Sequence, residues 1–150
     1  MSASRPRSVV VVGASVAGVR AAQVLRSRGF DGRITLIDAE NHPPYDKPAL
    51  SKALLTGETE PAALGLLADG ELDDQGIGLR LGVRALSLDT RRQCVSTSDG
   101  DEVAYDDLVV ATGSTPRRVG ALEHHAGVHY LRPWPTPSPC VQRSRGAATL

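Results

Sequence analysis

The chain has 150 residues, of which 41% are hydrophobic and 23% charged, a composition typical of one globular domain with its own core. Lys plus Arg and Asp plus Glu both total 17 and the basic residues are scattered, which argues against nucleic acid or an acidic membrane as a partner. No stretch approaches the roughly 18 apolar residues of a membrane helix, and residues 1–8 lack the apolar core of a signal peptide. We therefore expect a cytoplasmic protein whose partner is a small molecule or another protein.

The first elements form a predicted β-α-β unit. Val9 to Val12 are four consecutive β-branched residues, typical of a strand that is buried on both faces of a parallel sheet. The apolar spacing over Val16 to Arg28 predicts a helix that ends at Gly29. Ile34 to Ile37 is expected to be the second parallel strand.

The segment from Asn41 to Ser51 reads NHPPYDKPALS, with three prolines and no periodicity. It predicts an ordered or partly mobile loop and no regular element. Loops of this length are often functional, although a simple connector is the alternative.

Short strands separated by turn signals follow, and they predict a small antiparallel meander. These strands are Leu79 to Leu81, Ala85 to Leu88, Gln93 to Thr97 and Glu102 to Tyr105. Leu108 to Ala111 is fully apolar and is predicted to return to the parallel sheet.

A glycine-rich turn between the first strand and the helix carries the first functional signal. In VVVVGASVAGVRAAQVL, Gly13 and Gly18 take the first and third positions of the GxGxxG fingerprint, and Ser15 takes the second. The start of a helix at such a turn can bind a pyrophosphate. The alternative is a tight turn in an unrelated doubly wound protein.

Acidic residues at the end of the second strand strengthen the dinucleotide hypothesis. Asp38 and Glu40 lie about 20 residues after Gly18, where an acid is expected to bind a ribose hydroxyl. An acid there disfavours a 2′-phosphate, so the site suits FAD or NAD and not NADP. Either acid could have this role.

Four segments in this order resemble one family of flavoproteins: VVVGASVAGVRAA, GFDGRITLIDAE, PPYDKPALSK and YDDLVVATGSTPR. The resemblance is to FAD-dependent ferredoxin reductases of the putidaredoxin and rubredoxin reductase type, and it covers residues 8–132. It implies a Rossmann-like three-layer α/β domain that binds FAD, with a parallel central sheet and a small antiparallel β-meander. Residues 1–132 are then an incomplete FAD/NAD(P)-binding domain.

The resemblance also implies roles for individual residues at the FAD site. It assigns the pyrophosphate to Gly13, Ser15, Ala17 and Gly18, and the adenosine ribose to Asp38 or Glu40. It places the backbone of Ala85 at the adenine, and Pro48 and Lys52 in the loop that reaches the flavin. It brings Ala111, Thr112 and Gly113 close to the cofactor, together with Arg132 of the Tyr130-Leu131-Arg132 segment. Taken singly, Lys52 and Arg132 could equally be solvated surface residues.

The sequence predicts no metal site, disulfide or hydrolase machinery. Cys94 and Cys140 form no CxxC pair, so redox chemistry would have to come from a cofactor. The histidines share no ligand spacing with them; they are His42, His124, His125 and His129. No nucleophile elbow is present, and no catalytic residue is assigned.

The pattern of the family stops after Arg132. Residues 133–150 hold four prolines within seven residues and no apolar periodicity, which indicates a disordered or out-of-frame tail. A reading frame displaced by one nucleotide gives a different translation of this tail if codons ending in G or C are assumed. That translation is an amphipathic alanine-leucine helix, similar to the segment that follows YLR in the family. We therefore expect a truncated chain that lacks an NAD(P)H domain and leaves an edge of its sheet open.

Two functional hypotheses follow. In the first, the complete enzyme passes a hydride from NAD(P)H to FAD, which then reduces a ferredoxin-like or rubredoxin-like iron–sulfur protein. This chain alone is expected to be inactive. In the second, it is an inactive remnant with weak or no nucleotide binding.

Overall fold

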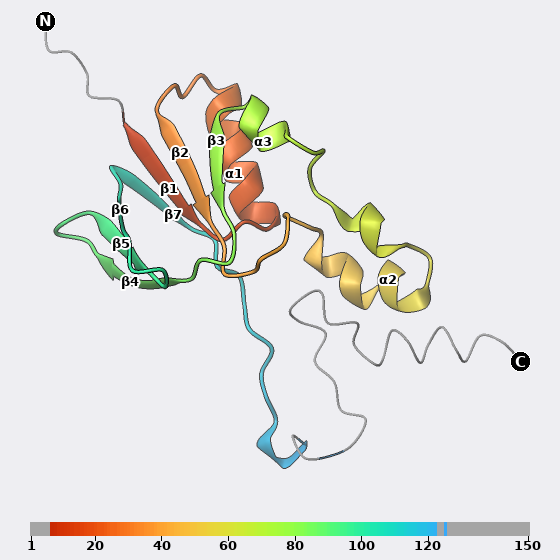
Figure 1. Cartoon of the computed structure of the whole chain (residues 1–150). Helices are drawn as coiled ribbons and strands as arrows, with labels where there is room; N and C mark the ends of the chain where they lie inside the picture. Colours follow the sequence, from red (N-terminus) through yellow and green to blue (C-terminus); the bar gives the residue numbers. More distant parts are fainter. Residues whose placement is uncertain (1–6, 123–124, 126–150) are drawn as a thin grey trace, which may run out of the picture. The chain divides into compact units, whose positions relative to one another are not determined.

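The computed structural model describes residues 7–122 and residue 125 (Figure 1). The described chain divides into two compact units. The first comprises residues 7–45 and 66–113, and the second comprises residues 46–65 together with the described residues from 114 onward.

The predicted β-α-β unit is confirmed. Strand β1 (Ser8–Val12) pairs in parallel with β2 (Arg33–Ile37), with Val9 opposite Ile34. Helix α1 (Val16–Ser27) connects the two strands, and its end lies one residue before the predicted end. The run of valines forms a strand because β-branched side chains suit a sheet that is covered on both faces.

Within the described residues, four parallel strands form the main sheet in the order β3-β2-β1-β7. Strand β7 (Asp107–Val110) pairs in parallel with β1, which confirms that this apolar segment returns to the parallel sheet. Strand β3 (Ile77–Arg80) pairs with β2 after a short helix, α3 (Glu71–Asp74).

The assignment of residues 79–81 to the meander was therefore wrong. Ile77 is buried and Leu79 packs against the same core cluster, between the main sheet and α1. These contacts require a place beside β2. The local turn signals mark where the strand ends but carry no information on which sheet it joins.

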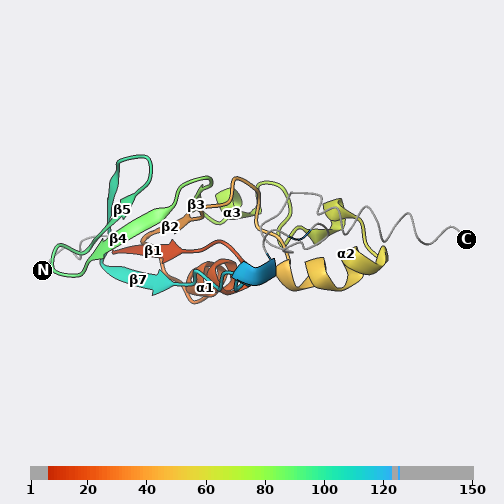
Figure 2. The same cartoon turned by 90° about the horizontal axis from the view of Figure 1, so that it is seen from below.

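The small antiparallel sheet contains three strands, as predicted from Ala85 onward: β4 (Ala85–Asp89), β5 (Cys94–Thr97) and β6 (Glu102–Ala104). Val95 of this sheet packs with Val10 and Ile37 on one face of the main sheet. Val9 and Val11 point to the other face, in a cluster with Ala22 of α1. In Figure 2, α1 and the β4 and β5 strands accordingly lie on opposite sides of β1. The first unit is thus a three-layer α/β domain.

The second unit contains short helical segments: η1 (Lys47–Ser51), α2 (Ala53–Thr56), η2 (Pro61–Leu64) and η3 (Gly120–Leu122). The prediction that Asn41 to Ser51 forms no element was wrong for its last five residues, which are η1. Pro48 lies at the start of this 3-10 helix, where a missing backbone N–H costs nothing. Leu50 is buried and helps to fix this turn.

Candidate functional site

The turn between β1 and α1 requires glycine for steric reasons. Gly13 has a φ of +107°, and a Cβ atom there would collide with the backbone carbonyl of Ala111 at the end of β7. A Cβ atom on Gly18 would collide with the carbonyl oxygen of Gly13 and would lie 3.2 Å from a side-chain carbon of Val11. The two glycines therefore allow the turn, α1 and β7 to approach one another closely.

The start of α1 is suited to an anion. Ser15 is the N-cap residue in an extended conformation, and its side chain makes no capping hydrogen bond. The first turn contains no acidic residue, and Val16 and Ala17 are exposed. The first N–H groups of a helix have no acceptor within the helix, and the helix dipole is positive at this end. Such a terminus favours binding of a phosphate.

Asp38 holds the turn in place from the end of β2. Its Oδ2 accepts a hydrogen bond from the backbone N–H of Ala14 at 2.6 Å. Its Oδ1 accepts one from the backbone N–H of Glu40 at 2.8 Å. Both carboxylate oxygens are therefore used to connect the glycine-rich turn with the segment after β2.

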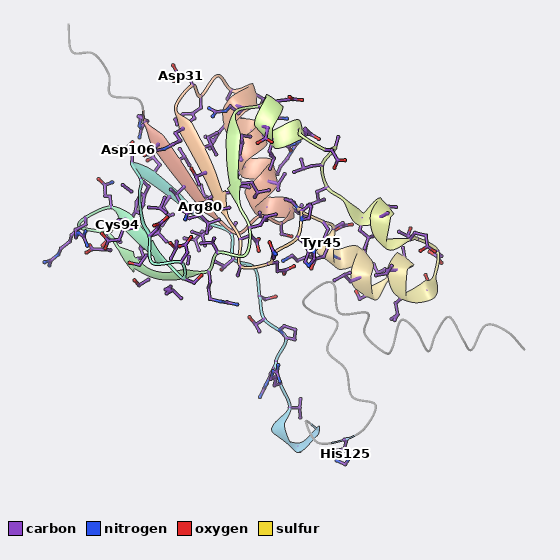
Figure 3. The ribbon with its side chains drawn as sticks, viewed as in Figure 1. Asp31, Tyr45, Arg80, Cys94, Asp106 and His125 are labelled. Carbon is purple, nitrogen blue, oxygen red and sulfur yellow. The ribbon has the colours of Figure 1, made fainter. Side chains whose placement is uncertain are left out.

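Glu40 lies two residues further on and is held by different groups. Its Oε2 accepts a hydrogen bond from the hydroxyl of Tyr45 at 2.8 Å, and its carbonyl accepts one from the N–H of Gly82 at 3.0 Å. Tyr45 is buried, with 6% of its surface exposed, whereas Glu40 is half-buried. In Figure 3, Tyr45 lies near the end of the sheet at which β1 and β2 finish.

The connection from β3 to β4 lies beside this segment. The N–H of Val83 donates to the carbonyl of Asp38 at 2.9 Å, next to the contact between Gly82 and Glu40. Ala85, the predicted adenine contact, is the half-buried first residue of β4. It therefore follows closely on the part of the chain that contacts Asp38.

The end of β7 lies on the other side of the glycine-rich turn. The N–H of Ala111 donates to the carbonyl of Val12 at 2.8 Å, and the carbonyl of Ala111 is the group that excludes a side chain at Gly13. Thr112 and Gly113 follow and are exposed. The first unit thus brings together most of the predicted site residues at the carboxyl edge of its sheet: Gly13, Ser15, Ala17, Gly18, Asp38, Glu40, Ala85, Ala111, Thr112 and Gly113.

Three predicted site residues are not part of this group. Pro48 lies in η1, and Lys52 is an exposed residue between η1 and α2, so both belong to the second unit. Arg132 lies outside the described residues, as does the tail at 133–150. The roles assigned to these residues stay predictions.

Sequence reasoning did not identify Tyr45 or Gly82 as members of the site. Tyr45 is part of PPYDKPALSK, but nothing in that pattern shows that its hydroxyl reaches back to an acid five residues earlier. Gly82 has a φ of +70°, and a lone glycine after a strand was the only available signal.

The side of the site near β3 carries an ion-pair cluster. Arg80, which is labelled in Figure 3, places one guanidinium nitrogen 2.6 Å from Asp99 and 2.7 Å from Asp101. These two acids lie in the turn between β5 and β6. The hydrogen bond from Arg80 to Asp101, with the one to Asp99, raises the pKa of the guanidinium above its ordinary value. Arg80 therefore stays a cation and connects the small sheet to the end of β3.

The part of the chain that the structure describes contains neither a metal-binding cluster nor a membrane-spanning helix. No three His, Cys, Asp or Glu side chains there gather as ligands for a metal ion. No helix among those residues combines the length and apolar character needed to cross a membrane.

The parallel sheet, the glycine-rich β1-α1 turn and the antiparallel layer define a Rossmann-like α/β domain of the type found in FAD- and NAD(P)-binding oxidoreductases. The chain belongs to the pyridine nucleotide-disulphide oxidoreductase family, whose sequence profile matches residues 7–136. This match includes the whole of residues 8–132, the segment on which the resemblance to ferredoxin reductases rests.

Individual relatives are consistent with that resemblance. The chain is 40% identical over 126 residues to a rubredoxin-NAD(+) reductase of Pseudomonas putida, covering 83% of this chain and 33% of that protein. It is 39% identical over 125 residues to the ferredoxin–NAD(+) reductase component of the p-cumate 2,3-dioxygenase system of Pseudomonas putida, covering 83% and 31%. The chain thus spans about a third of the length of these curated relatives.

Solved structures show the same fold. Putidaredoxin reductase in its covalent complex with putidaredoxin matches with a TM-score of 0.74 and 37% identity, over 78% of this chain and 28% of that chain. The ferredoxin reductase for the CYP199A2 system of Rhodopseudomonas palustris matches with a TM-score of 0.71 and 35% identity, over 75% and 28%. The resemblance to reductases of this type is therefore confirmed.

Proposed function

We propose that this chain forms the adenosine and pyrophosphate part of an FAD site. In the complete protein, electrons would pass from NAD(P)H through FAD to a ferredoxin-like or rubredoxin-like iron–sulfur protein. The names of the relatives, which are reductases of rubredoxin and ferredoxin, support this electron path. The observation that carries the proposal is the hydrogen bond from Ala14 to Asp38, because it brings the glycine-rich turn and Glu40 to one edge of the sheet.

The residues at the turn fit a pyrophosphate. The two glycines leave no side chain between the helix terminus and the turn, and the first turn of α1 contains no carboxylate to repel an anion. We assign the pyrophosphate to the turn of Gly13 and Ser15 and to the first residues of α1, Ala17 and Gly18.

We assign the adenosine ribose to Glu40. Both oxygens of Asp38 accept backbone N–H groups, and we assign Asp38 to support of the turn. Glu40 follows it on a half-buried segment that is fixed by Tyr45 and Gly82. A carboxylate there accepts hydrogen bonds from ribose hydroxyls and repels a 2′-phosphate, which suits FAD.

The remaining assignments follow the resemblance. Ala85 would contact the adenine through its backbone, and the segment of Ala111, Thr112 and Gly113 would pass beside the cofactor. Pro48, Lys52 and Arg132 would contribute to the flavin end. A cytoplasmic location, expected from the sequence, belongs to the same proposal.

When bound, FAD would supply the redox chemistry, because flavins accept a hydride and release electrons one at a time. The residues described here would bind and orient the adenosine end. The hydride donor site and the docking surface for the iron–sulfur protein belong to the proposal for the complete protein, since the chain spans about a third of its relatives.

Calorimetric titration of the purified 150-residue chain with FAD, ADP and FMN tests this proposal. FAD and ADP should bind because both contain adenosine and a pyrophosphate, whereas FMN should not. Glu40→Gln should weaken ADP binding about tenfold or more through loss of charged hydrogen bonds. The control Glu58→Gln, in the second unit, should leave it unchanged. A folded chain that binds FMN as well as it binds ADP would contradict the proposal.

A further inference from the structure

We propose that Tyr45 is a positioning residue that fixes the carboxylate of Glu40 for recognition of the ribose hydroxyls. This inference rests on the proposed function and adds a residue to it. It predicts that the phenol hydroxyl of Tyr45 sets how strongly the site distinguishes a nucleotide with ribose hydroxyls from one without them.

The position of Tyr45 is itself well fixed. Only 6% of its surface is exposed, so its ring has little room to move. The preceding residue, Pro44, is also buried, and its carbonyl accepts a hydrogen bond from the N–H of Leu66 at 3.0 Å. The hydroxyl of Tyr45 is therefore presented from a rigid part of the first unit.

The main chain of Glu40 is fixed from two sides. The N–H of Glu40 donates to Oδ1 of Asp38, and its carbonyl accepts from Gly82. A glutamate side chain has three rotatable bonds, and ordering them opposes binding. The 2.8 Å hydrogen bond from Tyr45 to Oε2 orders them before a nucleotide arrives. Preorganisation of this kind raises affinity because the entropy cost of ordering the side chain is not incurred when the nucleotide binds.

The chemistry of this pair suits a diol ligand. A phenol hydroxyl donates to a carboxylate oxygen, and an ionised carboxylate accepts hydrogen bonds and donates none. The contact thus orients Glu40 as an acceptor for neighbouring hydroxyl donors.

The test compares ADP with 2′,3′-dideoxy-ADP, which lacks both ribose hydroxyls, on the full chain. We expect the unmodified chain to bind ADP at least about tenfold more tightly than the dideoxy nucleotide. In Tyr45→Phe this ratio should fall to about threefold or less, while affinity for dideoxy-ADP stays unchanged. In Glu40→Gln, and in the double variant, the ratio should approach one.

A matched control separates this effect from a general loss of packing. Tyr105 also belongs to the first unit, where it packs against the cluster on the face of the sheet covered by the small sheet. Tyr105→Phe should therefore leave the ratio unchanged. Partial unfolding multiplies both apparent dissociation constants by the same factor, so the ratio is unaffected if Tyr45→Phe lowers stability.

The outcomes distinguish the inference from the function on which it rests. Suppose that Glu40→Gln abolishes the ratio but Tyr45→Phe keeps the ratio of the unmodified chain, with or without an equal loss of affinity for both nucleotides. Tyr45 then has only a structural role, and the inference is overturned. If Glu40→Gln keeps the ratio, or a folded unmodified chain binds neither nucleotide, the ribose assignment itself is overturned.

Discussion

Asp38 and Ala14, which are 24 positions apart in the chain, are joined by a hydrogen bond of 2.6 Å from the backbone N–H of Ala14 to Oδ2 of Asp38. The bond connects the end of β2 to the turn that begins α1. A single acid thereby sets the distance between the proposed pyrophosphate and ribose subsites. Its second oxygen accepts the N–H of Glu40, which extends the connection to the proposed ribose acceptor.

Replacing Asp38 should destabilise the first unit. Asp38→Ala removes the acceptor of two backbone N–H groups in a partly buried region, so we expect the free energy of unfolding to fall by about 1–3 kcal/mol. Urea unfolding followed by circular dichroism measures this change. Asp69→Ala, at an exposed position, is the control and should change the free energy by less than about 0.5 kcal/mol. Equal effects of the two substitutions would show that the connection is unimportant.

Gly13 and Gly29 allow two causes of lost stability to be measured separately. One is a strained backbone conformation, and the other is a collision of an added side chain with neighbouring atoms. Both have a positive φ, +107° and +83°, but only a Cβ atom on Gly13 would collide with other backbone atoms. We expect Gly29→Ala to cost about 1 kcal/mol for the strained conformation. Gly13→Ala should cost at least about 3 kcal/mol, because Ala111 must also move. Similar unfolding midpoints for the two variants would refute the close approach of β7 to the turn.

Arg26 should be a major stabilising residue at the opposite end of α1. Its guanidinium donates to four backbone carbonyls, those of Phe30, Gly32, Gln75 and Gly76. Arg26→Ala leaves these acceptors without their donor, and we expect a loss of about 2 kcal/mol or more in the free energy of unfolding. The exposed neighbour Arg28 provides the control, and Arg28→Ala should have little effect. The contacts would be unimportant if the two variants unfolded at the same urea concentration.

The turn between β5 and β6 should show a specific pH response. The hydroxyl of Thr97 donates to Asp99 at 2.6 Å and lowers the pKa of that carboxyl, and Arg80 lowers it further. In the folded chain the pKa of Asp99 lies below its value of about 3.9 in the unfolded chain. The contribution of Asp99 to stability is therefore fully present at pH values above about 3.9. It is lost as the pH falls through the folded pKa.

Carboxyl NMR titration of Thr97→Val tests this relationship directly. The substitution removes the donor, so the pKa of Asp99 should rise toward its ordinary value. Thr90→Val, at an exposed position in another turn, should leave the pKa of Asp99 unchanged. An unchanged pKa of Asp99 in Thr97→Val would show that the Thr97 hydroxyl is not the main cause of the lowered pKa.

Features encoded locally could be predicted from the sequence, and features that depend on distant contacts could not. The four valines predicted β1, the apolar spacing predicted α1 and the glycine spacing predicted the turn, because burial and close packing leave direct residue patterns. The sheet to which β3 belongs depends on contacts of Ile77 and Leu79 across the core, which no local pattern carries. The proposed assignment of the ribose to Glu40 instead of Asp38 likewise depends on the hydrogen bonds of Asp38, which no local sequence pattern shows.

The central claim is that the carboxyl edge of the parallel sheet binds an adenine dinucleotide, and amide NMR of the labelled chain during titration with ADP tests it most directly. We predict that the largest shifts cluster in residues 13–18, 38–40 and 82–85, because the turn, the acidic segment and the connection to β4 meet there. Saturation of these shifts should give one dissociation constant. A folded chain whose amides do not respond to ADP, or respond mainly in β5, β6 or α3, would contradict the account.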